Sequence, residues 1–248
     1  AHGVAREERL ANKQASDVVP SAKKANPQFS ILPRFWVPAE DVPPHPGIVI
    51  GFRDITNATN ARTMVATALP EVGSGHKLPL IFTKVAPPLQ LCLLANLNSF
   101  ALDWGTRQKF NGTSMNFFVV EQLPVLPPTA YGAELGEGTV EGWIAERTLR
   151  LVYTADDMQP VARAMGYDGA PFVWDEEERR HLRAGLDAMF FLLYGLTRED
   201  AGEMLDSFTV VKRDEVKMYG RFALKELILG YMTAYEAGDH HARVNVMP

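Results

Sequence analysis

The chain has 248 residues, of which 46% are hydrophobic, and its formal net charge is −5. This apolar content is enough for one large domain or two small ones with real cores, and it excludes general disorder. The only cysteine, Cys92, excludes an intramolecular disulfide and favours a reducing cytoplasm. No apolar run approaches the roughly 20 residues that span a bilayer, and no secretory signal is visible. A polar start without Met indicates a processed chain or an expressed fragment, and we favour the fragment.

The charge is divided unevenly along the chain. Residues 48–116 carry three more basic than acidic side chains, whereas residues 141–208 carry seven more acidic than basic ones. A negative net charge taken alone argues against a nucleic-acid partner, but binding depends on the local distribution of charge. The first segment is therefore a candidate for contact with phosphate groups, and the second is not.

The first 130 residues predict a strand-rich region behind a polar lead-in. Residues 1–30 have no sustained apolar periodicity, which is typical of a linker. Apolar residues at spacings of three and four predict one amphipathic helix from Leu89 to Trp104, ended by Gly105. β-branched and apolar runs predict strands over residues 48–55, 62–69, 78–82 and 116–120.

Large aromatic side chains are expected mainly in the core. Four tryptophans are available to stack on nucleic-acid bases: Trp36, Trp104, Trp143 and Trp174. Burial is the commoner fate of such residues. We therefore expect Trp104, Phe117 and Phe118 to be buried, together with the pair Phe190-Phe191.

The second half of the chain is predicted to be helical. Asp175 followed by Glu178 is a capping-box pattern that opens a helix ending near Gly195, and Thr197 with Asp200 is a weaker box of the same kind. Apolar patterns predict further helices over residues 144–153 and 222–235. The predicted organisation is α+β, with a lead-in (1–30), a strand-rich domain (31–130), a linker (131–142), a helical domain (141–236) and a tail (237–248).

Catalytic motifs of methyl transfer are absent from the sequence. A methyltransferase that modifies an amino group needs a glycine-rich turn for its cofactor and an Asn/Asp-Pro-Pro-aromatic loop for the base. Here Pro88 is followed by leucine and Pro128 by threonine. The chain is therefore not expected to transfer methyl groups by itself.

Two other motifs have weak chemical signatures. The turn Gly73-Ser74-Gly75-His76-Lys77 has the composition of a phosphate-binding loop, but its glycine spacing does not match a P-loop; a tight turn or a contact with one DNA phosphate remains open. Glu215-Val216-Lys217, with Asp206 upstream, has the spacing of a metal-dependent nuclease. Charged triplets of this kind are also common on solvated loops, and the adjacent pair His240-His241 is a poor metal site.

Three stretches together resemble a known family. They are GFRDITNATNART (51–63), leading to GHKLP (75–79), then LLANLNSFALD (93–103) with RQK (107–109), and GTSMNFFVVEQLPVLP (112–127). Their order resembles the C-terminal specificity region of N6-adenine DNA methyltransferases of restriction–modification and phage-defence systems, including fused type IIG methylase–endonucleases. It is also similar to type I specificity subunits. The likeness continues to about residue 235, but the catalytic domain that lies upstream in that family is absent.

The resemblance implies that this chain reads a short site in double-stranded DNA. An upstream methyltransferase domain or subunit would hold S-adenosylmethionine and flip out the adenine, and this chain would hold no cofactor. Basic side chains would neutralise phosphates, and Asn, Gln and Arg would pair with base edges. The candidate DNA-binding residues are Arg53, Asn57, Asn60, Arg62, His76, Lys77, Arg107, Gln108, Lys109, Asn111 and Thr113.

Two other functions remain open on the sequence. The first is a protein-interaction or scaffold module of a phage-defence complex, which would use the acidic stretches 175–178 and 199–206. The second is a metal-dependent nuclease built on Glu215 and Lys217. The recognition hypothesis predicts salt-sensitive duplex binding that is lost when Lys77, Arg107 and Lys109 are changed together to Ala. It depends on these basic groups converging on one face of the molecule.

Overall fold

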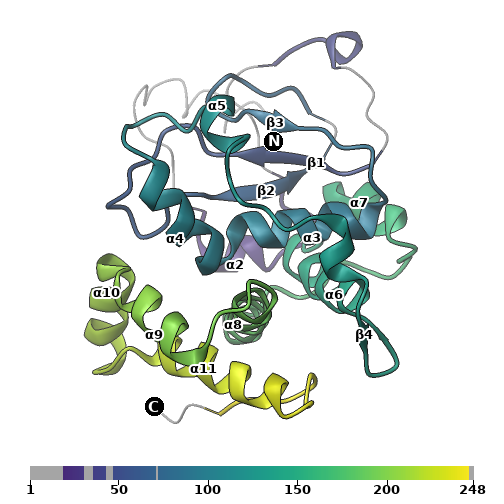
Figure 1. Cartoon of the computed structure of the whole chain (residues 1–248). Helices are drawn as coiled ribbons and strands as arrows, with labels where there is room; N and C mark the ends of the chain where they lie inside the picture. Colours follow the sequence, from purple (N-terminus) through teal and green to yellow (C-terminus); the bar gives the residue numbers. More distant parts are fainter. Residues whose placement is uncertain (1–18, 31–35, 43–46, 71, 246–248) are drawn as a thin grey trace.

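A small antiparallel sheet lies in the first half of the chain (Figure 1). The computed structural model describes residues 19–30, 36–42, 47–70 and 72–245. The three strands of this sheet are β1 (Val49–Phe52), β2 (Ala66–Leu69) and β3 (Leu80–Ile81), in the order β2-β1-β3. Val49 lies opposite Leu69, and Ile50 lies opposite Ile81. The strands predicted over 48–55, 62–69 and 78–82 are therefore confirmed, each over a shorter span.

Two helices, rather than the single one predicted from Leu89 to Trp104, cover one face of this sheet. They are α3 (Pro87–Asn98) and α4 (Phe100–Lys109). The helix is interrupted at Ser99, where the backbone is extended. The side chain of Ser99 accepts from the Leu102 amide at 3.2 Å and caps α4. Gly105 lies inside α4 rather than at its end. The helical spacing of apolar residues continues across Ser99, so the sequence pattern did not indicate two helices.

The strand predicted over residues 116–120 is wrong. These residues form a short helix, α5 (Phe117–Val120), because the side chain of Asn116 accepts from the Val119 amide at 3.1 Å and starts a turn. The β-branched run Val119-Val120 favoured a strand, but strand preference depends on a pairing partner as much as on residue type. α5 lies beside the sheet, on the side away from α3 and α4 (Figure 1).

The second half of the chain is helical, as predicted. Its caps at Asp175 and Thr197 are confirmed, and Thr197 with Asp200 forms a complete capping box. Helix α10 was not predicted. The elements are η2 (Pro128–Tyr131), β4 (Glu134–Leu135), β5 (Gly138–Thr139), α6 (Val140–Val152), η3 (Asp156–Met158), α7 (Gln159–Ala164), α8 (Glu176–Leu193), α9 (Arg198–Asp206), α10 (Thr209–Tyr219) and α11 (Ala223–Glu236).

Described residues near both ends of the chain contact this helical half, such as Ser21, which donates to Glu176 at 3.1 Å. The predicted lead-in lies outside the described residues as far as position 18, and the remainder contains the short helix α2 (Ser21–Lys24). Another short turn, η1, spans Ala39–Asp41. Near the other end, the indole of Trp143 on α6 donates to the His240 carbonyl at 2.9 Å.

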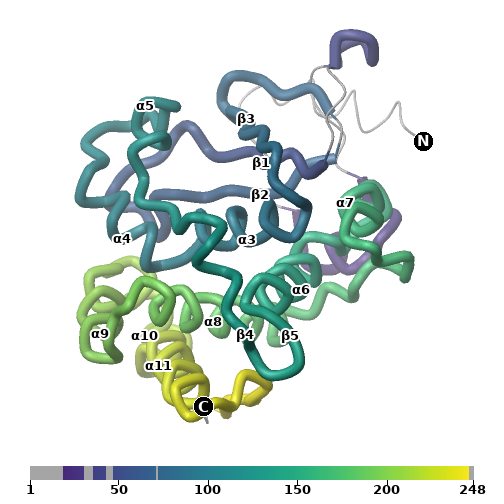
Figure 2. The backbone as a smooth tube through the Cα atoms, turned by 45° about the vertical axis from the view of Figure 1, so that its right-hand side comes forward, coloured from purple at the N-terminus to yellow at the C-terminus, as the bar shows by residue number. Residues whose placement is uncertain are grey.

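The architecture is α+β, in tiers that Figures 1 and 2 show from two directions. The sheet lies above α3 and α4, and α8 to α11 lie below them. One hydrophobic core joins the sheet to α6 through residues such as Phe52 and Leu149. A second core surrounds Phe190 and Phe191 of α8, both fully buried as expected, and includes Phe100 of α4. Each core therefore contains residues from both predicted domains.

Candidate nucleic-acid interface

Three segments that are distant in sequence meet beyond the end of β1. We call residues 53–63, 73–78 and 107–116 the loop cluster. The Thr56 amide donates to the Thr113 carbonyl at 3.1 Å, and the Met115 amide donates to the Asp54 carbonyl at 2.7 Å. The Asp54 amide in turn donates to the Lys77 carbonyl at 3.3 Å. The predicted site residues therefore belong to one connected region of the surface.

The carboxylate of Asp54 joins all three segments of the cluster. It accepts from the Lys77 ammonium at 2.8 Å and from the Ser114 hydroxyl. Hydrogen bonds from Lys77 and then from Ser114 lower the pKa of Asp54, so the side chain is ionised at neutral pH. Lys77 thus supports the cluster, while its side chain is still 58% exposed.

A second carboxylate, Asp103 of α4, is hydrogen-bonded to the end of the first loop segment. Its side chain is fully buried and accepts from Arg62 Nε at 2.7 Å. The Thr63 amide also donates to it at 3.1 Å, and the Met64 amide at 3.0 Å. A buried carboxylate with this many donors is well compensated for its loss of water. Asp103 therefore fixes the path of residues 62–64.

The three arginines of the predicted site are engaged inside the protein. Arg53 donates to the Arg62 carbonyl at 2.6 Å, and Arg62 also stacks over the ring of Phe100. Arg107 donates to the Asn60 carbonyl at 2.6 Å, and its guanidinium lies 3.9 Å from the ring centre of Phe208. These groups shape the loops, and only a rearrangement would free them for a base or a phosphate.

The other eight predicted residues are exposed. Some have local roles: Asn57 Oδ1 accepts from the Thr59 amide at 2.9 Å, and Lys109 donates to the Gln122 carbonyl at 3.0 Å. The exposed set is Asn57, Asn60, His76, Lys77, Gln108, Lys109, Asn111 and Thr113. Among them, Lys77 and Gln108 also donate within the protein, to Asp54 and to the Trp104 carbonyl.

Three residues of this region were missed from the sequence. Asp54 and Asp103 are acidic residues within an otherwise basic segment, and that contrast is the signal that could have identified them. Phe118, which was expected in the core, is 73% exposed on α5, and this expectation is wrong. The expectation is also wrong for its neighbour Phe117, which is 50% exposed although its ring contacts Phe52.

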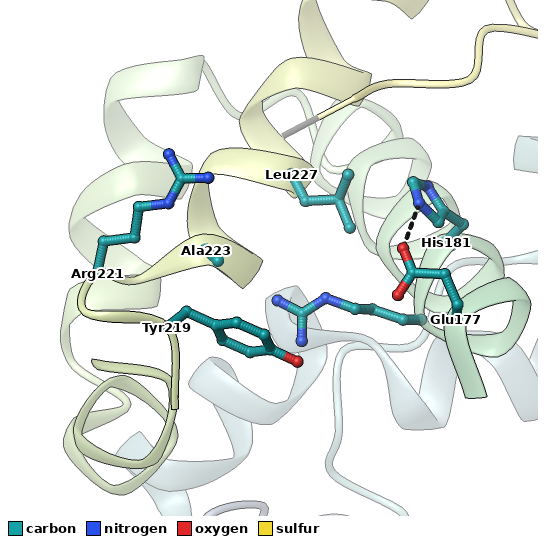
Figure 3. Close-up of a pocket in the computed structure, with 7 residues that line it drawn as sticks. Glu177, His181, Tyr219, Arg221, Ala223 and Leu227 are labelled. Atoms are coloured by element: carbon teal, nitrogen blue, oxygen red, sulfur yellow. Dashed lines mark hydrogen bonds and ion pairs between the residues drawn. The ribbon is translucent and has the colours of Figure 1, made fainter. Parts of the chain in front are cut away.

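A pocket of about 260 Å³ lies in the helical half, between α8 and the start of α11. Figure 3 shows His181 and Glu177 on one side of it and Arg221 on the other. His181 contacts Glu177 at 3.1 Å and Tyr231 at 2.7 Å, and burial lowers its pKa. Within the described lining, only His181 and Glu177 are paired with each other. Arg180 and Arg221 pair instead with carboxylates outside it, Glu215 and Glu226. Two buried nitrogens of Arg221, Nε and Nη2, have no hydrogen-bond partner among the described residues.

The nuclease motif is also engaged in internal contacts. Glu215 lies on α10 and forms a bidentate ion pair with Arg180, with N–O distances of 2.7 and 2.6 Å. It also accepts a hydrogen bond from the Leu224 amide. Asp206 pairs with Lys212 and with Lys225. Within the described parts of the chain, no three His, Cys, Asp or Glu side chains are grouped so that they could hold a metal ion.

A wide groove runs between the free edge of β2 and helices α6 and α8. Its volume is about 1790 Å³, and its lining is mainly apolar. Asp187 of α8 lies at this groove and accepts from the Phe100 amide at 2.8 Å, so it links the second half of the chain to the start of α4. Burial raises the pKa of Asp187 to about 6.

Comparison with known proteins gives no further assignment. No family model, no curated protein and no solved structure matches the chain at a significant level. Among the residues that the structure describes, none of the helices combines the length and the apolar content that crossing a membrane requires.

Proposed function

We propose that this chain is a DNA-recognition module of a restriction–modification N6-adenine methyltransferase, and that the loop cluster is its DNA-binding surface. The observation that carries the proposal is the convergence of the three segments beyond β1. Together they contain five Arg and Lys residues and one acidic residue, Asp54. The exposed cations among them, Lys77 and Lys109, supply the positive charge that binding of phosphates requires.

The contacts of the cluster assign different roles to its buried and its exposed residues. The arginines and the two carboxylates hold the loops, whereas Lys77 and Lys109 at the rim would contact phosphates. The exposed amides of Asn60, Gln108 and Asn111 are of the type that pairs with base edges. S-adenosylmethionine and the residues of methyl transfer would belong to a separate domain or subunit, as in the family that the sequence resembles.

The test is duplex binding as a function of salt. The double variant Lys77→Gln/Lys109→Gln removes two exposed charges at the rim. We expect binding of a mixed-sequence 20-base-pair duplex to weaken about tenfold, and the slope of log K against log salt to become shallower by about two, one for each lost phosphate contact. Fluorescence anisotropy between 50 and 200 mM salt measures both quantities.

The matched control is Lys212→Gln/Lys217→Gln, which removes two exposed lysines from α10 and changes the net charge equally. It should leave the binding and its slope unchanged. A wild-type chain without salt-dependent duplex binding, or an equal effect of both variants, would refute the proposal.

A docking module is the second candidate, and helix α10 favours it. This helix of 11 residues has no buried side chain, and it exposes Val216, Met218 and Tyr219. Isolated exposed apolar residues are ordinary, but a helix without a buried face often has a partner. Capture of a methyltransferase subunit by a chain that does not bind duplex DNA would favour this function over the first.

A further inference from the structure

The side chains of α5 divide into an anchored set and a free one. Phe117 packs edge-on against Phe52 in the core, with ring centres 5.6 Å apart, and Val119 and Val120 pack against the same core. Phe118 projects away from them and is 73% exposed. Its exposure therefore does not come from a loosely attached helix, because its neighbours hold α5 to the sheet.

The backbone around Phe118 is fixed by hydrogen bonds on both sides. Asn116 caps the helix before it, and the side chain of Gln122 donates to the Phe118 carbonyl at 2.8 Å. The ammonium of Lys109 donates to the Gln122 carbonyl at 3.0 Å, which ties α5 to the end of α4. An aromatic ring on a fixed backbone loses little conformational entropy when it binds, because only two side-chain torsions remain to be ordered.

The surroundings of Phe118 are favourable to a polyanion. Residues 107–120 contain Arg107 and Lys109 and no acidic side chain, and the exposed Glu121 follows at the end of α5. Through Gln122, the backbone of Phe118 is linked by hydrogen bonds to Lys109 at the rim of the loop cluster. Apolar side chains next to phosphate-binding groups are used by DNA-binding proteins to enter between bases, and aromatic rings stack on bases that have left the helix.

We propose that Phe118 stacks on the face of a nucleobase where the bound duplex is opened, and that it stabilises the opened state. This inference rests on the proposed function of the loop cluster and adds a ligand to it. Loss of one base–aromatic stack corresponds to a loss of affinity of about tenfold, within a wide range. Because Phe118 has little packing of its own to lose, its substitution should not unfold the chain.

Two DNA probes test this role. One is a fully paired 20-base-pair duplex, and the other is the same duplex with one unpaired adenine, each labelled with 2-aminopurine beside the central position. The wild-type chain should bind the opened duplex about tenfold more tightly than the paired one. Phe118→Ala should lose this preference while binding the paired duplex within about twofold of wild type, and Phe118→Trp should retain it.

Met218→Ala is the matched control, because Met218 is equally exposed but lies on α10. It should keep both affinities and the 2-aminopurine signal. If Phe118→Ala retains the preference for the opened duplex, the stacking role is wrong even though the loop cluster binds DNA. If the wild-type chain binds neither duplex, the proposed function itself fails. Loss of capture of a methyltransferase subunit by Phe118→Ala, with DNA binding intact, would make Phe118 a protein contact and also overturn the inference.

Discussion

The acidic side chains that hold the loops of the first half differ in burial from those on the surface of the helical half. In the strand-rich half, Asp54 and Asp103 are buried, and each accepts from several donors in different segments. In the helical half, ion pairs such as Lys212–Asp206 and Arg213–Asp214 lie at the surface. Exposed pairs stabilise little, whereas removing one partner of a buried pair leaves other groups without compensation.

This contrast shows what holds each half together. The helices are held by apolar packing around Phe190 and Phe191, so their surface charges are free to vary. The loops of the first half contribute Phe110 and Met115 to the core beneath the sheet, and their polar groups are joined through the two carboxylates. Substitutions of acidic residues should therefore have large effects in the first half and small effects on the surface of the second.

The largest effect is expected for Asp103→Ala. This change would leave Arg62 and the amides of Thr63 and Met64 without their acceptor in a buried position. A destabilisation of about 3–5 kcal/mol is typical when a buried charged group loses its partner. Urea denaturation measures the free energy of unfolding.

Asp214→Ala is the counterpart in the helical half, because this side chain is exposed and pairs only with Arg213 among the contacts described. It should change the free energy of unfolding by less than about 0.5 kcal/mol. Equal effects of the two substitutions would remove the distinction between the halves.

Asp187→Asn should have a smaller effect of opposite sign. Burial raises the pKa of Asp187 from 3.8 to about 6, so the native state binds this proton more tightly than the unfolded chain does. The contribution of the group to stability is present below about pH 4 and is lost as the pH rises to about 6. Asparagine retains an acceptor for the Phe100 amide and cannot ionise.

The variant should therefore be more stable than wild type at pH 7, by up to about 3 kcal/mol if each pKa unit contributes about 1.4 kcal/mol. The difference should shrink as the pH falls from 6 to 4. Urea denaturation at several pH values measures it, and Asp168→Asn on an exposed loop is the control. A difference that does not change with pH would show that Asp187 ionises normally.

An effect smaller than those of Asp103 and Asp187 is expected at the edge of the sheet. The side-chain amide of Asn98 accepts from the Ala66 amide at 3.1 Å and donates to the Ala66 carbonyl at 3.0 Å, as a neighbouring strand would do. Asn98→Ala should cost about 1–2 kcal/mol and increase the hydrogen exchange of the Ala66 amide. The Phe52 amide, which donates to Pro79 inside the sheet, should remain protected. Unchanged exchange at Ala66 would contradict this role of Asn98.

The parts of the fold that were predictable depend on short-range signals. The caps at Asp175 and Thr197 act on amides three residues away, so the sequence pattern contains the whole interaction. Helix α5 was mistaken for a strand because its β-branched residues were weighed without knowledge of a pairing partner. The separation of α3 from α4 at Ser99 was missed because the spacing of apolar residues shows which face of a helix is buried. It does not show where the helix axis changes direction.

The sequence predicted which loops form the candidate site, but it did not predict the contacts inside the site. Positions 53–63 and 107–116 were selected from their polar and basic residues, and the structure places them side by side. The burial of Asp103 against residues 62–64 involves a separation of about 40 positions, and no local pattern records it. The same holds for Arg107, which looked available for DNA and instead packs on Phe208.

Helix α6 has a consequence for how the molecule unfolds. Trp143 and Ile144 on this helix belong to the core around α8, whereas Ala145 and Leu149 belong to the core beneath the sheet. Melting of one core would therefore strip packing from the other, and heat should unfold the whole chain in one cooperative step. For the same reason, a protein truncated between the two halves would expose one side of α6 to water and would be prone to aggregate.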